Sequence, residues 1–137
     1  STAPVPAPPT TSGGKRPPRY VQLPPAPTPR NMDELHRQFA RRLVDTHPDT
    51  SYTTPSPSRL LAIPVLEIEL NADGSVRGIS VLRKPSTGNE ATTLAIAAIR
   101  RAAPYGNVSR LPRPWKLVET FLFDDDLRFK PRILDIR

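Results

Sequence analysis

A chain of 137 residues has room for one folded domain and an appended segment. It contains no cysteine, which excludes disulfides, thiolate metal sites and cysteine nucleophiles, and no apolar run approaches the ~20 residues needed to cross a bilayer. The net charge of +7 suggests nucleic acid, anionic lipid or an acidic polymer as a partner. Residues 31–137, however, hold 16 Lys and Arg against 13 Asp and Glu, and so contribute only +3.

Proline divides the chain into two parts. Ten of the 19 prolines lie within residues 1–30, where they alternate with Ala, Thr and Val and leave little apolar bulk for a core. We therefore expect a disordered, basic linker at residues 1–30 and one domain at residues 31–137. A stiff spacer and a ligand for SH3-like domains are the alternatives for the linker. Because the chain begins at Ser1 without an initiator Met, we also expect a fragment or processed form, with any membrane anchor upstream.

Two helices and three strands are expected in the domain. Asn31 can cap a helix whose apolar residues recur at helical spacing as far as His47-Pro48. Residues 61–82 alternate around an Asp73-Gly74 turn and predict a hairpin. An alanine-rich helix at residues 89–103 and a strand at residues 115–124 follow, and residues 128–136 add a short strand or pack along an edge. The order α-β-β-α-β predicts an α+β fold, in which a small antiparallel sheet of about three strands carries two helices on one face.

No residue pattern indicates catalysis. His36 and His47 have no partner at a recognised spacing, which favours surface or capping roles over a metal site or a catalytic dyad. Glu67 and Glu69 share one strand face, where cross-strand ion pairs are favoured over acid–base chemistry. Residues 124–126 lack the Gly and Glu of a calcium loop and predict a charged turn. We therefore expect no enzyme activity, no metal and no cofactor.

Three segments resemble one protein family. Residues 73–82, DGSVRGISVL, resemble the hairpin of TonB C-terminal domains. Residues 98–105, AIRRAAPY, are similar to the close of the second helix in TonB and TolA relatives. Residues 121–123, FLF, look like the end of the final strand in that family. The order of the three segments, behind a proline-rich arm, is also similar.

The resemblance implies a mechanical adapter in the periplasm of a Gram-negative bacterium, tethered to the inner membrane through an upstream anchor. In this family a proton-driven ExbB–ExbD motor engages the anchor, and the C-terminal domain holds a segment of an outer-membrane transporter beside its last strand. Because the strand at residues 115–124 follows a crossover, we expect it to be an edge strand with open backbone groups. The alternative is that residues 129–136 cover this edge. The expected partner-binding residues are Trp115, Lys116, Leu117, Val118, Glu119, Thr120, Phe121, Leu122 and Phe123.

Two other functions stay open at this stage. A TolA-like or machine-specific structural adapter would serve the cell envelope without energy coupling. A nucleic-acid binder would use the net charge of +7, with weak and non-specific contacts, since the charge of the domain is spread over several elements. For the TonB-like and the TolA-like adapter, the expected partners are envelope proteins, with no small-molecule substrate.

Overall fold

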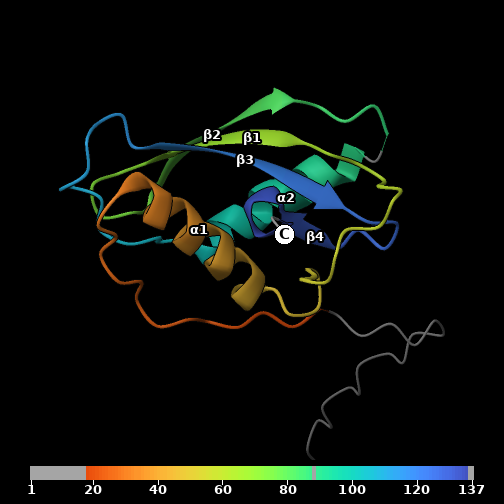
Figure 1. Ribbon diagram of the computed structural model, residues 1–137, viewed down its shortest axis with the longest axis horizontal. Coiled ribbons are helices and arrows are strands. Elements are labelled where there is room, and N and C mark those ends of the chain that lie inside the picture. Colours follow the sequence, from red (N-terminus) through yellow and green to blue (C-terminus); the bar gives the residue numbers. More distant parts are fainter. Residues whose placement is uncertain (1–17, 88, 136–137) are drawn as a thin grey trace, which may run out of the picture.

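The computed structural model describes residues 18–87 and 89–135. The expected order α-β-β-α-β is confirmed, and a short strand and a 3-10 helix follow it (Figure 1). The elements are α1 (Met32–Thr46), β1 (Val65–Leu70), β2 (Val76–Arg83), α2 (Asn89–Ala102), β3 (Lys116–Phe123), β4 (Phe129–Pro131) and η1 (Arg132–Asp135).

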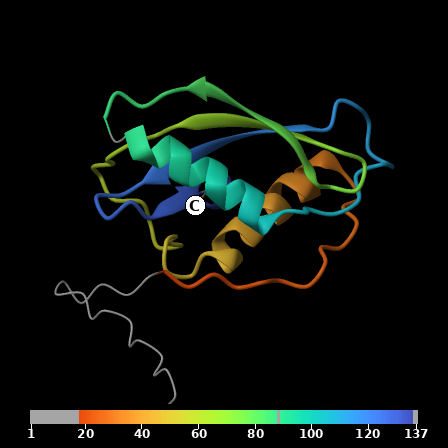
Figure 2. The same cartoon turned by 180° about the vertical axis from the view of Figure 1, so that it is seen from behind.

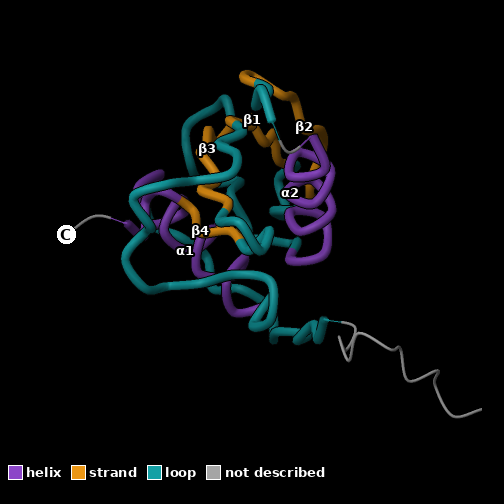
Figure 3. Tube along the Cα trace, turned by 90° about the vertical axis from the view of Figure 1, so that its right-hand side faces the viewer, coloured by secondary structure: helices purple, strands orange, loops and turns teal. Residues whose placement is uncertain are grey.

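The sheet has four strands in the order β2-β1-β3-β4, and all its pairs are antiparallel. Both helices lie on the same face of the sheet, and no helix of the described residues covers the other face (Figures 2 and 3). The α+β class and the placement of the helices are therefore as expected. To the three expected strands residues 129–131 add a short fourth, which is one of the two roles expected for residues 128–136.

Helix α1 begins where the sequence supplies a cap. The Asn31 side chain accepts a hydrogen bond from the Glu34 amide at 2.7 Å, and Glu34 in turn accepts from the Arg30 amide at 2.9 Å. Residues four apart on one side of the helix are fully buried, namely Leu35, Phe39 and Leu43. The helix is therefore fixed by its cap at one end and by an apolar stripe along its length.

The core lies between this stripe, the alanine face of α2 and the inner side of the sheet. Leu66, Ile68 and Leu70 of β1 are almost completely buried, as the alternation with glutamate predicts. Helix α2 meets the core through small side chains, so its backbone can lie close to the strands. Those small side chains are Ala91, Ala95, Ala98 and Ala102.

The β1–β2 turn is locked to the loop that follows α2. Gly74 has φ of +88°, and its carbonyl accepts the Tyr105 amide at 2.9 Å. A Cβ atom at Gly74 would meet the Gly106 carbonyl oxygen at 2.1 Å. Glycine is therefore required at this position both for its backbone angle and for the close approach of the two loops.

The described part of the proline-rich segment is not a free linker. Residues 18–30, here called the strap, run along α1 (Figure 1). The Val21 amide donates to the Thr46 carbonyl at 2.9 Å, and Gln38 donates to the carbonyl of Pro27 at 2.7 Å. Arg42 binds a further strap carbonyl at 2.9 Å. The expectation that residues 1–30 as a whole lie apart from the domain is therefore wrong for the strap, while residues 1–17 lie outside the described residues.

Candidate protein-binding edges of the sheet

Strand β3 was expected to be an edge strand, and this is wrong. Its first five residues pair with β1, and Phe121–Phe123 pair on the other side with β4. The alternative expectation, that the C-terminal segment covers this edge, is what the structure has. Sequence reasoning could not decide this point, because a three-residue strand that ends in Pro131 carries little periodicity.

The covering strand β4 is anchored in the core. Phe129 is 2% exposed, and its ring centroid lies 5.7 Å from that of Phe121 and 5.9 Å from that of Phe123. The Lys130 ammonium donates to the Asp135 carboxylate at 2.7 Å, and this contact lowers the pKa of that carboxyl. A partner strand that takes the place of β4 must break these contacts.

Only a short part of β3 keeps an open side. The Phe121 amide donates toward β1, to the carbonyl of Pro64 at 3.0 Å, so alternation directs the amides of Lys116, Val118 and Thr120 away from β1. The Thr120 amide is already bonded to the Glu119 carboxylate at 3.1 Å. Two of the three outward donors, the amides of Lys116 and Val118, therefore have no hydrogen-bond partner, backbone or side chain, among the described residues.

The expected partner-binding residues are thus divided between different environments. Leu117, Phe121 and Phe123 are buried on the helix-facing side. Glu119 is also buried there, and the imidazole Nε2 of His36 lies 2.9 Å from its carboxylate. The more exposed residues are Trp115, whose ring packs under Arg113, together with Lys116, Val118 and, partly, Thr120. The pairing of His36 with Glu119 was not anticipated, because the two residues are far apart in the chain.

Strand β2 is the longer open edge. No strand among residues 18–87 and 89–135 pairs with its outer side, and it forms the rim of the sheet (Figures 1 and 3). Glu67 lies opposite Ser80, and alternation makes this a pair whose backbone groups face each other. The amides and carbonyls of Ile79 and Val81 therefore point outward, while their side chains pack against the core.

Both ends of the β2 edge are irregular. The register shifts where Leu82 is inserted between the partners of Val65 and Leu66, and again where Arg77 is inserted near the turn. Bulges and charged residues are common protections of natural sheet edges. They confine the regular open stretch to residues 78–81, where an added Cβ at Gly78 would meet nothing within 4 Å.

The remaining polar groups have structural partners. His47 is fully buried: its Nδ1 donates to the Leu43 carbonyl at 2.6 Å, and its Nε2 accepts from Arg101 at 2.9 Å. Burial is the main cause that lowers the pKa of this imidazole. Asp124 accepts the amides of Asp126 and Arg128 at 3.0 and 2.9 Å, which is the charged turn expected there. Within the described part of the chain, no group of three or more His, Asp or Glu side chains is placed to hold a metal ion.

Comparison with known proteins adds no relative. No family model matches the chain, and no match was found among the curated proteins or the solved structures. Of the helices in residues 18–87 and 89–135, none combines the length and apolar character that a membrane span requires.

Proposed function

We propose that this chain is a non-enzymatic adapter of the bacterial envelope, in which the sheet takes up an extended segment of a partner protein as a strand beside β2. The observation that carries the proposal is the unpaired outer side of β2, with the backbone groups of Ile79 and Val81 directed away from β1. The resemblance of residues 73–82, 98–105 and 121–123 to TonB and TolA domains supports the same class of function. In this proposal the protein works in the periplasm, between an inner-membrane motor and an outer-membrane transporter.

Strand addition suits this edge physically. An added strand would form hydrogen bonds with the amides and carbonyls of Ile79 and Val81, each worth about 0.5–1.5 kcal/mol net. Gly78 and Ser80 alternate with these residues, and their small side chains leave space for those of the partner. Because the regular stretch is short, main-chain bonds alone give weak binding, and side-chain contacts outside the edge must add affinity.

The test compares the two open edges. The chain is titrated with peptides from the N-terminal plug segments of outer-membrane transporters, and binding is followed by amide chemical shifts. Ile79→Pro removes an outward donor of β2 and should abolish binding, whereas Ile79→Ala keeps the donor and should retain it. Val81→Pro tests the same edge at a second position, and circular dichroism identifies any variant that fails to fold.

Val118→Pro and Val118→Ala form the matched pair for the open part of β3. Binding that is lost in Val118→Pro but kept in both β2 proline variants would move the docking site to β3. Binding that survives all proline substitutions in folded protein would refute strand addition at either edge.

The proposal covers two kinds of adapter, and an experiment in cells separates them. An energy transducer requires the proton gradient, so its transport function should stop when a protonophore is added. A structural adapter of TolA-like or machine-specific type should keep its partner contacts under the same conditions. We propose the energy transducer first, because residues 73–82 resemble the hairpin of TonB C-terminal domains, whereas residues 98–105 are similar to TonB and TolA relatives alike.

A further inference from the structure

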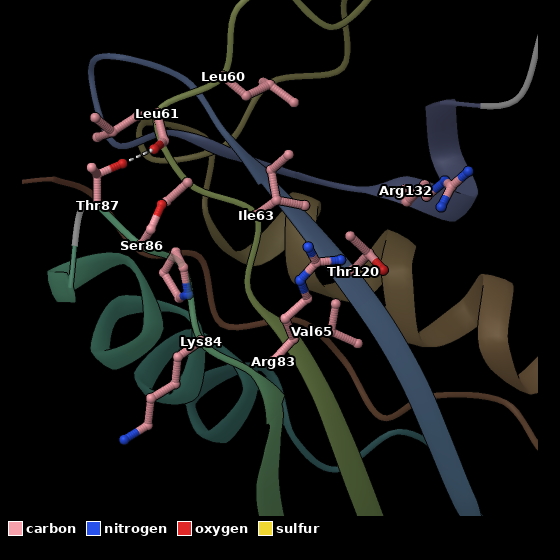
Figure 4. Close-up of a pocket in the computed structure, with 12 residues that line it drawn as sticks. Leu60, Leu61, Ile63, Val65, Arg83, Lys84, Ser86, Thr87, Thr120 and Arg132 are labelled. Atoms are coloured by element: carbon pink, nitrogen blue, oxygen red, sulfur yellow. Dashed lines mark hydrogen bonds between the residues drawn. The ribbon is translucent and has the colours of Figure 1, made fainter.

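The outer face of the sheet carries a basic hollow that the strand-addition proposal does not use. It has a volume of about 460 Å³ and lies where β1 begins and β2 ends (Figure 4). Its floor contains Ile63, Val65 and Thr120, and the side chain of Ile63 is 43% exposed. Ile63 and Val65 thus offer aliphatic surface beside the hydroxyl of Thr120.

Two guanidinium groups flank this floor. Arg83 extends from the end of β2 across Val65 toward Ile63 and Thr120, and Arg132 of η1 lines the hollow beyond Thr120 (Figure 4). No acidic residue lines the hollow, and no ion pair formed within residues 18–87 and 89–135 includes either arginine. The hollow is therefore positively charged over an apolar floor.

The backbone at the floor is also open. The Arg83 end of β2 pairs with Val65, and Pro85, which lacks an amide proton, stops the ladder before it reaches Ile63. The carbonyl of Leu61 is bonded by the Thr87 hydroxyl at 2.9 Å. No hydrogen bond from a described residue reaches the backbone of Ile63, so a donor and an acceptor remain available beside the two arginines.

We propose that this hollow binds an acidic segment of a partner protein. A carboxylate of the segment lies between Arg83 and Arg132, where guanidinium forks match it, and a neighbouring aliphatic side chain covers Ile63 and Val65. The apolar floor and the open backbone of Ile63 favour a peptide over a phosphate group, which would leave the floor uncovered. The site uses side chains of the outer face and the open backbone of Ile63, and it does not depend on whether a strand is added beside β2 or β3.

The test titrates the full chain with a peptide in which aspartate and valine alternate. Binding should shift the amides of Ile63, Val65 and Thr120 and should weaken as salt is added. Peptides with asparagine in place of aspartate, or serine in place of valine, should bind at least tenfold more weakly. Inorganic phosphate and phosphatidylglycerol vesicles should not compete. If either competes as well as the acidic peptide, the site is a general anion site and the proposal fails.

Substitutions of exposed arginines supply the matched controls. Arg83→Gln and Arg132→Gln, tested singly, should each weaken the acidic peptide at least tenfold, whereas Arg100→Gln, which removes one charge from the exposed side of α2, should leave its affinity unchanged. Equal losses of peptide affinity in all three variants would mean that only the net charge matters, and this would overturn the proposal. Ile79→Pro should not affect this affinity, so failure of the hollow and failure of strand addition at β2 are distinguishable.

Discussion

Acid should weaken the fold through His47. The buried ring donates from Nδ1 to the Leu43 carbonyl and accepts at Nε2 from Arg101. This arrangement requires the neutral imidazole, because a proton on Nε2 would face the donor of Arg101. The ring also packs edge-on against Tyr20 and Phe129, with centroids 5.6 and 5.5 Å away, and no carboxylate contacts it in the described structure.

The direction and the size of the pH effect on the unfolding free energy follow from the burial of His47. Burial lowers the pKa of His47 in the folded protein below its ordinary 6.5, so the unfolded chain binds the proton more readily. The contribution of His47 to stability is therefore complete above about pH 6.5 and decreases as the pH falls toward the folded pKa. A single histidine whose pKa is lowered from 6.5 can cost at most about 1.4 kcal/mol for each pH unit below that value, so its loss at pH 5 is at most about 2 kcal/mol.

The assay is urea unfolding at pH 7.5 and pH 5. The carboxyls whose pKa values are lowered, those of Glu34, Asp49, Asp73 and Asp135, lose their contributions below their ordinary values of 4.5 and 3.8, so this window excludes them. The wild type should lose about 1–2 kcal/mol of unfolding free energy between these two pH values. His47→Gln should show little change with pH, whereas an undiminished acid loss in this variant would refute the reasoning.

Three further predictions concern stability. Deletion of residues 18–30 should lower the midpoint of thermal unfolding by several degrees, because the strap bonds to α1; an unchanged midpoint would show that these bonds add nothing. Asp135→Asn should lower the urea unfolding free energy by roughly 3 kcal/mol, since it leaves the Lys130 ammonium buried without its anion, and Lys130→Met added to it should recover part of the loss. Gly74→Ala should destabilise the fold by more than about 2 kcal/mol through its positive φ and its overlap with Gly106, whereas Gly78→Ala in open space should cost under about 1 kcal/mol.

Local patterns predicted the elements of the domain well. The Asn31 cap, the glutamate alternation in β1 and the alanine face of α2 each concern neighbours in the chain, and each lies in the structure as expected. The turn at Asp73-Gly74 was also predicted. The contact of Gly74 with Gly106 was not predicted, because it joins two loops that are distant in the chain.

Contacts between segments distant in the chain were harder to predict from the sequence. Strand β3 can join either side of the β1–β2 hairpin, and composition does not reveal that it pairs with β1 and leaves β2 at the rim. The strap was missed for a similar reason: a proline-rich segment lacks apolar periodicity, yet its carbonyls can accept hydrogen bonds from Gln38 and Arg42. The basic hollow joins residues from four separate segments, so no local motif could have indicated it.

Amide hydrogen exchange of the free protein tests the open β2 edge most directly. The Ser80 amide faces Glu67 in the ladder and should be protected, whereas the amides of Ile79 and Val81 should exchange nearly as fast as in an unfolded chain. Addition of a transporter plug peptide should then slow Ile79 and Val81 without changing Ser80. Strong protection of Ile79 and Val81 in the free protein, or no change in them when the peptide is bound, would contradict strand addition at β2.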